Sequence, residues 1–333
     1  MLTRTEAQKY TGVWPVMLTP FNHQWEIDWR SLEKLVEWYL AAGVHGLFAA
    51  CQSSEMFFLS DTEARQLVTF IVERVDGRVP VVASGHTANA PSQQAEQLAA
   101  MAETGIDGLI LISNRLALAG DTDRQVLAAL QQLTAALPQE IDLGIYECPY
   151  PYKRLLSDEI VVWCATSGRY TFIKDTCCSL PTIERRVKLS QGSRLHLANA
   201  NSQTLLASLR VGCQAYSGVM ANFHPALYVW LFEHWRTEPE IAGQLADYLS
   251  TAALVEHLDY PACAKFYQQQ LGNFSSITCR SKNSQSYPDS FYPAAIDSMV
   301  TWRHFAHAFA RLIRGIPCSS FIPGTQKIAS PAG

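Results

Sequence analysis

The strongest constraint on the fold of this 333-residue sequence is a repeat of short apolar runs, most of them followed by a stretch with helical spacing. Nearly continuous apolarity, without strict alternation, is typical of parallel strands that helices cover on both faces. We predict eight strands, at residues 12–19, 46–51, 79–85, 108–113, 143–148, 170–175, 195–200 and 215–219. Amphipathic helices are expected between them, at residues 30–42, 62–75, 92–103, 124–137 and 183–189.

Eight strands with interleaved helices over about 220 residues predict an α/β fold, a (β/α)8 TIM barrel. A doubly wound sheet is the alternative, but no Gly-rich dinucleotide motif follows the first run. After residue 235 the strand pattern stops, and helices are expected at residues 238–257, 263–271 and 294–314. We therefore expect a barrel domain at 1–235, followed by a C-terminal helical domain at 236–333 that ends in an irregular tail from 316.

The composition excludes several functional classes. With 26 Lys+Arg, 30 Asp+Glu and a formal net charge of −4, the chain lacks the basic footprint of a nucleic-acid binder. No window approaches the ~18 apolar residues of a membrane span, and the first residues lack a secretory signal. The nine cysteines include no CxxC pair, so neither a zinc site nor a disulfide framework is expected. These features predict a cytoplasmic protein without a bound metal.

Polar residues at the predicted strand ends are the candidates for catalysis, because active sites of such barrels lie at the carboxyl ends of the strands. Lys174 directly follows an apolar run, so it should face the barrel interior. Burial disfavours the charged form of lysine, and a neutral amine can form a Schiff base with a ketone. Tyr146, one predicted strand away, could transfer a proton beside that imine. The alternatives are a surface lysine, a lysine neutralised by Asp175, and a tyrosine that only packs inside the barrel.

Four motifs follow one another along the chain: Leu-Thr-Pro-Phe at 18–21, Cys-Gln-Ser-Ser-Glu at 51–55, Tyr-Glu-Cys-Pro at 146–149 and Phe-Ile-Lys-Asp at 172–175. In this order and at these separations they resemble the dihydrodipicolinate synthase/N-acetylneuraminate lyase family of class I aldolases. The resemblance runs from residue 12 to the end of the barrel. It implies a Schiff-base-forming lyase that acts on pyruvate or a 2-oxo-3-deoxy acid and needs no cofactor.

The resemblance also implies roles for individual residues. Lys174 would be the Schiff-base lysine, and Tyr146 would be the general acid/base. Gln52 and Ser53 would lie where the family receives the 1-carboxylate of the substrate. Ser217 would lie where the family offers backbone contacts to the 2-oxo acid.

Three departures from the family pattern bear on the synthase reaction. Gln52 replaces the first hydroxyl residue of the strand-two motif. Residues 113–116 lack the tyrosine that completes the proton relay of the synthases. Pro151 stands where the synthases have the arginine that holds the carboxylate of the second substrate. We therefore expect that this chain is not itself a dihydrodipicolinate synthase.

Three further residues are candidate members of the site. Glu147 replaces the family asparagine and is expected near the mouth of the barrel, which His86 could also line. Arg115 could meet an anionic distal group of the substrate. If Glu147 or His86 serves as an extra acid/base, the imine could end in dehydration of a 2-keto-3-deoxy sugar acid. A third hypothesis is a protein that binds a small acid without turning it over.

Self-association is expected on two grounds. Only 17% of the residues are charged, against a usual value of about 25%, while 48% are hydrophobic, and symmetric assembly is the commonest way to cover such a surface. The resemblance implies a homotetramer, a dimer of dimers, in which the exit of strand four at residues 114–119 meets a neighbouring subunit. We expect Leu116 and Leu118 to supply an apolar contact there.

Overall fold

The computed structural model describes residues 8–282, 304, 306, 309 and 313. The helix expected at 294–314 falls almost entirely outside the described residues, and so does the tail expected from 316. Eight parallel strands form one sheet in the order β1-β8-β7-β6-β5-β4-β3-β2. These strands are β1 (Gly12–Val13), β2 (Leu47–Phe48), β3 (Val81–Ala83), β4 (Gly108–Ile112), β5 (Asp142–Tyr146), β6 (Tyr170–Asp175), β7 (His196–Asn199) and β8 (Ala215–Tyr216).

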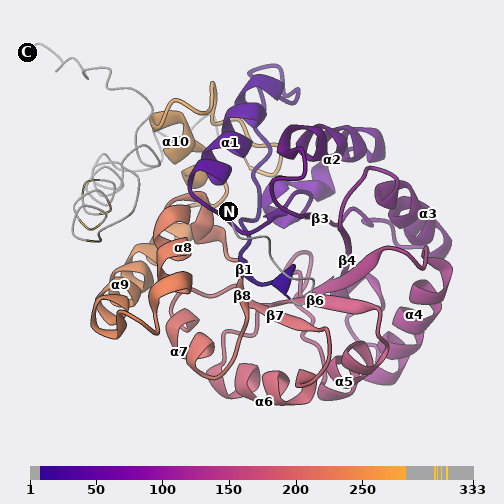
Figure 1. Cartoon of the computed structure of the whole chain (residues 1–333). Coiled ribbons are helices and arrows are strands. Elements are labelled where there is room, and N and C mark those ends of the chain that lie inside the picture. The colour runs from indigo at the N-terminus through magenta and orange to yellow at the C-terminus, as the bar shows by residue number, and fades with distance from the viewer. Residues whose placement is uncertain (1–7, 283–303, 305, 307–308, 310–312, 314–333) are drawn as a thin grey trace, which may run out of the picture.

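The sheet curls into a ring with the helices around it (Figure 1). A parallel bridge between Val16 and Phe48 joins its two edges next to β1 and β2. The predicted (β/α)8 barrel is therefore confirmed. Its helices are α1 (Trp29–Ala41), α2 (Asp61–Val75), α3 (Pro91–Ala102), α4 (Asp123–Ala136), α5 (Asp158–Thr166), α6 (Leu180–Ser190), α7 (Leu205–Arg210) and α8 (Pro225–His234).

Two of the helices begin at capping residues that are evident in the sequence. The Ser60 hydroxyl accepts a hydrogen bond from Glu63 N, and the Glu63 carboxylate accepts one from Ser60 N, which starts α2. Ser157 accepts a hydrogen bond from Ile160 N at the start of α5. Within the described residues, none of the helices is long and apolar enough to span a membrane.

The strands at the edges of the sheet are shorter than predicted. The apolar run at residues 12–19 contributes only the two residues of β1, because Pro15 has no N–H to donate to the strand ladder. The chain beyond Pro15 nevertheless stays buried, and Phe48 N donates to the Pro15 carbonyl (3.0 Å). Continuous apolarity thus predicted the burial of this segment and overestimated the length of its strand.

Inward-facing side chains fill the barrel, among them Trp14 and Phe172. The centroids of these two rings lie 5.5 Å apart. Phe172 stands where the resembling family has a glycine, so this position fills space inside the barrel here. Because side chains alternate along a strand, Lys174, two residues after Phe172, faces the interior as well.

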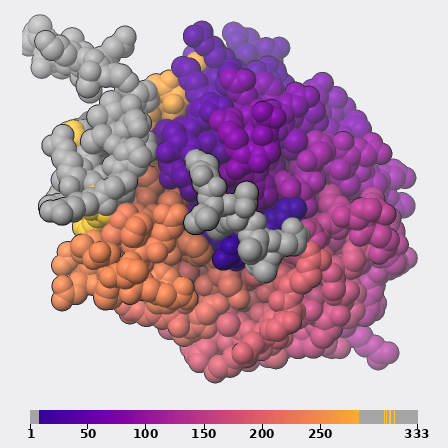
Figure 2. All heavy atoms as spheres, viewed as in Figure 1, coloured from indigo at the N-terminus to yellow at the C-terminus, as the bar shows by residue number. Residues whose placement is uncertain are grey.

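After the barrel the chain returns to its N-terminal half. Helix α9 (Pro239–Ala252), the short η6 (Ala253–His257) and α10 (Ala262–Gln270) follow α8, and α10 lies next to α1 (Figure 1). Figure 2 shows these orange segments meeting the indigo ones at the surface. Lys34 Nζ of α1 donates to the Gly272 carbonyl just after α10 (3.0 Å). Helices α9 and α10 lie where helices were expected, while the division into two domains stays a prediction.

The exit of β4 corrects one expectation about subunit contacts. Leu116 is only 7% exposed and belongs to the hydrophobic core of its own chain, so it is not available to a neighbouring subunit. Leu118 is 76% exposed. Both leucines were expected at a subunit contact, but the turn η4 (Ser113–Arg115) bends the chain directly before Leu116, which packs into the core of its own chain.

Candidate active site

Lys174 and Tyr146 are neighbours on adjacent strands of the barrel. The register pairs Tyr146 of β5 with Lys174 of β6. Lys174 Nζ lies 4.1 Å from the centroid of the Tyr146 ring and 5.6 Å from that of Phe48. Lys174 is only 3% exposed. The fold thus brings the two candidate catalytic side chains together inside the barrel.

The surroundings of Lys174 favour its neutral form. Burial lowers the pKa of Lys174 to about 8, because a site without water penalises the ammonium group. Among the described residues, no carboxylate forms an ion pair with Lys174. Asp175, the alternative partner considered from the sequence, pairs with Arg186 instead. About one tenth of the amine is therefore unprotonated at pH 7, far more than for an ordinary lysine, and this fraction can act as a nucleophile.

Glu147 belongs to a buried ion cluster and not to the mouth of the barrel, where it was expected. Arg186 Nη2 donates to Glu147 Oε1 (2.7 Å), and Nη1 of the same guanidinium donates to Asp175. Glu147 also accepts hydrogen bonds from Leu156 N (2.7 Å) and Thr176 N (2.8 Å). Every polar contact of this carboxylate thus lies within the protein framework.

The position of Glu147 follows from the alternation of side chains along a strand. Tyr146 and Lys174 face the interior, so the residues that follow them, Glu147 and Asp175, face the surrounding helices. Burial raises the pKa of Glu147, although the Arg186 guanidinium opposes this shift. The cluster joins the ends of β5 and β6 to α6, and we assign Glu147 a positioning role for the strands that carry Tyr146 and Lys174.

The loop after β2 holds Gln52 and Ser53 beside the barrel. It forms the short turn η2 (Gln52–Ser54), and the Ser54 hydroxyl anchors this turn by donating to the Met17 carbonyl (2.7 Å). Thr19 Oγ1 donates to the Ser54 carbonyl (2.8 Å). Ser54 replaces a glycine of the family motif, and its hydroxyl fastens the turn to the segment after β1.

Glu55 ties the same loop to the C-terminal helices. Its backbone is left-handed, with a φ of 58°, and its buried carboxylate forms an ion pair with Lys265 of α10. The other carboxylate oxygen accepts a hydrogen bond from Ser281 N (2.6 Å). The loop that carries Gln52 and Ser53 is therefore held in part by a residue 210 positions away.

A cavity of about 230 Å³ opens beside Tyr146. The candidate residues Gln52, Ser53 and Tyr146 line it. Lys174 does not line the cavity itself, but its Nζ packs on the Tyr146 ring. The remaining lining residues are Glu55, Phe57, Phe58, Pro149, Tyr150, Val219, Tyr260, Pro261, Ser281 and Lys282.

The Tyr146 hydroxyl shares a hydrogen bond with the Cys148 thiol. Cys148 Sγ in turn donates to Gln52 Oε1 (3.5 Å). Burial raises the pKa of Tyr146 well above its usual value, so the phenol carries its proton at neutral pH. Tyr146 is thus a proton donor, connected to Gln52 through a thiol.

Ser217 lies just beyond β8 and is completely buried. The register pairs Lys174 with Ala198 and Ala198 with Ala215, and Ser217 follows two residues later on the same side of its strand. Its Oγ has no hydrogen-bond partner among the described atoms. Because buried hydroxyls normally have a partner, this group is suited to a ligand.

His86 does not line the cavity and has the contacts of a structural histidine. Its Nε2 accepts a hydrogen bond from Ile112 N (2.6 Å), and its Nδ1 faces Gln94 Oε1 (3.2 Å). Burial lowers the pKa of His86 to about 4, so the ring is neutral at physiological pH. Both ring nitrogens are therefore engaged within the protein.

Arg115 lies next to the cavity without lining it. Its guanidinium carbon is 5.1 Å from the centroid of Phe57, which is a lining residue. Its Nη1 donates to Asn89 Oδ1 (2.7 Å). Arg115 thus contacts the site through the aromatic ring of Phe57 and not through an anionic group.

Tyr260, between η6 and α10, is a candidate site residue that the sequence reasoning missed. It lines the cavity, shares a hydrogen bond with the Ser53 side chain and accepts one from Asn222 Nδ2 (2.9 Å). Asn222 is oriented by Tyr39, whose hydroxyl donates to its Oδ1. The C-terminal helices thus supply a second phenol to the site. No local motif marks it, and its contact with Ser53 exists only in the folded chain.

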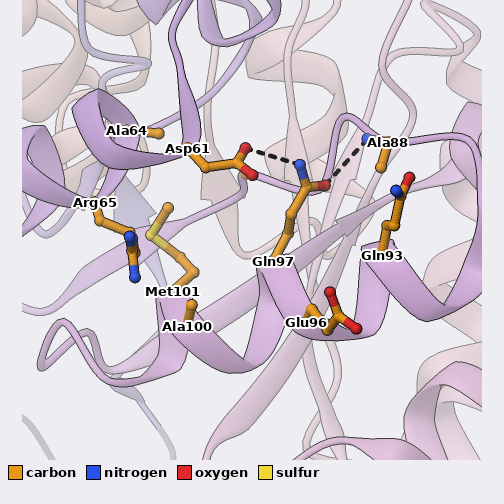
Figure 3. A pocket seen from close by; sticks show the side chains of 10 residues that line it. Asp61, Ala64, Arg65, Ala88, Gln93, Glu96, Gln97, Ala100 and Met101 are labelled. Carbon is orange, nitrogen blue, oxygen red and sulfur yellow. Dashed lines mark hydrogen bonds between the residues drawn. The ribbon is translucent and has the colours of Figure 1, made fainter.

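A separate cavity of about 390 Å³ lies between α2 and α3 (Figure 3). There Gln97 Nε2 donates to Asp61 Oδ1 (2.8 Å), and Gln97 Oε1 accepts from Ala88 N (3.0 Å). This cavity contains none of the candidate catalytic residues. Throughout the described part of the chain, no group of three or more His, Cys, Asp or Glu side chains could hold a metal ion.

Known proteins similar to this chain share one family and one fold. The profile of the Dihydrodipicolinate synthetase family matches residues 9–280. The 4-hydroxy-tetrahydrodipicolinate synthase of Methanospirillum hungatei is 25% identical over 263 residues, which cover 78% of this chain and 85% of the relative. The N-acetylneuraminate lyase of Citrobacter koseri is 32% identical over 108 residues, 32% of this chain and 36% of that one. The crystal structure of the chloride-inhibited dihydrodipicolinate synthase from Acinetobacter baumannii with pyruvate has a TM-score of 0.78 at 19% identity and covers 89% of this chain and 98% of that one.

Proposed function

This chain belongs to the dihydrodipicolinate synthetase family of class I aldolase-type lyases, and we propose that Lys174 is its Schiff-base residue. The substrate we propose is pyruvate or a 2-oxo-3-deoxy acid. The synthase from Acinetobacter baumannii, which shares the fold, is known in complex with pyruvate. The observation that carries the proposal is a buried lysine without a counter-charge, packed on the ring of Tyr146.

The proposed reaction begins with attack of the Lys174 amine on the ketone carbon of the substrate. The adduct loses water, which removes the ketone oxygen and leaves an iminium ion. The iminium withdraws electrons from C3, so the C3–C4 bond can break and release an aldehyde. In the opposite direction C3 loses a proton, and the resulting enamine attacks an aldehyde. Water finally hydrolyses the imine and frees the amine.

Tyr146 is the proposed acid/base at the C4 oxygen. During cleavage that oxygen loses its proton as C3–C4 breaks, and during condensation it gains one. A buried phenol that carries its proton is suited to the second task. Gln52 and Ser53 are proposed to receive the 1-carboxylate at η2, and Ser217 is proposed to contact the 2-oxo acid.

The test is reductive trapping of the imine. Incubation with pyruvate and borohydride should add one reduced pyruvoyl unit to Lys174, which peptide mass spectrometry would locate. Lys174→Ala should abolish the adduct, while Lys188→Ala, which removes an exposed amine of α6, should retain it. An adduct that persists in Lys174→Ala would contradict the mechanism.

The two other hypotheses receive less support from the contacts. Dehydration of a 2-keto-3-deoxy sugar acid would use Glu147 or His86 as an extra acid/base, but neither side chain lines the cavity. Both are held by hydrogen bonds within the protein. A protein that only binds a small acid would use the Lys174 ammonium as a counter-ion for the carboxylate. The pKa of Lys174, lowered to about 8, and the protonated phenol of Tyr146 beside it favour covalent chemistry instead.

We further propose that this enzyme is not a competent dihydrodipicolinate synthase, although it has relatives of that name. Pro151 replaces the arginine expected to hold the second carboxylate. The cations that follow Pro151 along the chain do not substitute for the arginine, because Lys153 donates to the Thr176 carbonyl and Arg154 donates to the Asp121 carbonyl (2.7 Å). Rapid condensation of pyruvate with aspartate semialdehyde would refute this proposal.

We also propose that the chain works in the cytoplasm as a homotetramer. The exposed Leu118 beyond β4 supports an apolar subunit contact. Leu118→Asp should then shift the protein toward smaller species without unfolding it, which light scattering with a circular dichroism control would detect. A monomeric parent protein at micromolar concentration would contradict the assembly.

A further inference from the structure

We propose that the second reactant at this site is an uncharged aldehyde with an apolar, aryl side chain. This inference rests on the proposed Schiff-base function and names the class of aldehyde that the enamine attacks or that cleavage releases. It starts from the lining of the cavity beside Tyr146. The polar lining groups are connected to one another: Tyr146 reaches Gln52 through Cys148, and Ser53 shares a hydrogen bond with Tyr260.

Most of the other lining residues are apolar. The rings of Phe57 and Tyr150 meet edge to face, with centroids 5.1 Å apart and an interplanar angle of 62°. Phe58 is 40% exposed and Tyr150 46% exposed, so both present apolar surface to solvent at the cavity. Val219, Pro149 and Pro261 complete this surface. A planar ring can pack against it and remove it from water.

The charges at the cavity are already paired. Lys282 Nζ lies 2.6 Å from Asp259 Oδ1, and Glu55 is paired with Lys265. Lys282 is thus the one cation among the described lining residues, and a carboxylate on the aldehyde would have to compete with Asp259 for it. Lys174 and Arg115 lie beside the cavity without lining it. A buried carboxylate without a free cation as its partner is strongly disfavoured, which argues against acidic aldehydes.

The same lining argues against sugar-derived aldehydes. Each hydroxyl of such a substrate loses its water on binding and needs a partner in the site. Phe57, Val219 and Pro261 offer no polar side-chain atom. Among the described residues, Ser281 has a buried hydroxyl without a partner in the lining, which suits a single polar substituent on a ring. A chain of hydroxyls would remain largely unpaired.

The reaction with an aryl aldehyde needs no further reagent. The enamine carbon C3 forms a bond with the aldehyde carbon, and the aldehyde oxygen takes the Tyr146 proton to become the C4 hydroxyl. C3 gives its proton to water when the enamine forms, and water returns a proton to the Tyr146 phenolate afterwards. Water hydrolyses the imine, so the product is a 4-aryl-4-hydroxy-2-oxo acid and the amine of Lys174 is restored.

The experiment compares aldehydes with the full-length protein and pyruvate. Values of kcat/KM would be measured for benzaldehyde, glyceraldehyde and succinic semialdehyde. We expect benzaldehyde to exceed both of the others by at least tenfold. Equal or higher values for glyceraldehyde or succinic semialdehyde would overturn the inference, and so would pyruvate trapping on Lys174 without any turnover of benzaldehyde. Absence of trapping would instead overturn the proposed Schiff-base function.

Variants test whether the apolar lining causes the preference. Phe57→Ser should lower the benzaldehyde-to-glyceraldehyde ratio about tenfold, since one to two kcal/mol of apolar contact is about that factor. Pyruvate trapping should remain. The matched control is Trp29→Ser, an exposed aromatic residue on α1 that lies outside the cavity, and it should leave the ratio unchanged. An unchanged ratio in Phe57→Ser would overturn the role of this wall.

Discussion

Of the lysines that the structure describes, two are almost completely buried, Lys174 in the barrel and Lys265 on α10, and they differ in their partners. Both amines lie over an aromatic ring, 4.1 Å from the centroid of Tyr146 and 4.5 Å from that of Phe21. Among the described residues, Lys265 also has a carboxylate partner, that of Glu55, and Lys174 has none. Burial alone therefore does not tell a reactive amine from a structural one, and the presence of a counter-charge does.

The physical reason is that a buried charge must be either balanced or removed. A paired ammonium keeps its charge, and removal of one partner leaves the other uncompensated. An unpaired ammonium gives up its proton more readily, which lowers its pKa and produces a nucleophile. Lys265 thus connects two parts of the fold, whereas Lys174, the proposed Schiff-base lysine, forms no ion pair with a carboxylate among the described residues.

The largest expected effect is on the turnover rate, when the Tyr146 hydroxyl beside Lys174 is removed. Tyr146→Phe should lower the turnover rate by about 10²–10⁴, the range for a lost general acid/base. Its unfolding free energy should change by about 1 kcal/mol, since one hydrogen bond to a thiol is lost. Steady-state rates and denaturant unfolding would measure both. A rate close to that of the parent would mean that another group transfers the proton, and Tyr260 would be the first candidate.

Substitution of Lys265 should change the stability of the fold. Lys265→Met should lower the free energy of unfolding by about 3–5 kcal/mol, because Glu55 becomes a buried charge without a partner. Adding Glu55→Gln to the same chain should recover part of this loss. Denaturant unfolding is the measurement. If the single variant were as stable as the parent, the contrast between the two lysines would fail.

Lys174→Met should change the free energy of unfolding in the opposite direction to Lys265→Met. The folded pKa of about 8 lies below the ordinary lysine value of about 10.4, so at pH 7 the folded state holds a proton that burial disfavours. Replacement by a neutral side chain should raise the free energy of unfolding by about 1–3 kcal/mol at pH 7. This advantage should shrink between pH 8 and pH 10.4, where the parent loses that proton on folding. A destabilised variant at pH 7 would contradict the unpaired state of Lys174.

The smallest effect is the pH dependence of imine formation. Below pH 8 the neutral fraction of Lys174 falls about tenfold per unit, so the trapping rate should fall in the same proportion. Initial rates with pyruvate and cyanoborohydride between pH 6 and pH 9 would show a rise that levels off near 8. A flat profile over that range would mean that the amine is neutral throughout.

Much of the barrel could be predicted because burial on both faces leaves a direct trace in the sequence. The eight apolar runs mark the eight strands. Helix α8 left no such trace, because it is apolar all around and therefore lacks the periodicity of an amphipathic helix. The length of strand β1 was overestimated, because an apolar run indicates that a segment is buried and does not show that it pairs with a neighbouring strand.

At the site, prediction succeeded where one strand determines the position of a side chain. Lys174 and Tyr146 were expected to face each other from neighbouring strands, and they lie in register. Glu147 was expected at the mouth because it follows Tyr146, but alternation turns it to the opposite face. Tyr260 was missed because its place beside Ser53 depends on how the C-terminal helices pack against the barrel, which no local pattern encodes.

The ion pair between Glu55 and Lys265 also limits how this enzyme can be recombined with its relatives. The two residues are 210 positions apart, so a single crossover anywhere between them separates the strand-two loop from its counterpart on α10. A chimera with only one of them would inherit an unmatched buried charge next to the loop that is proposed to receive the substrate. When chimeras of family members are made to change specificity, the strand-two loop and α10 should therefore come from the same parent.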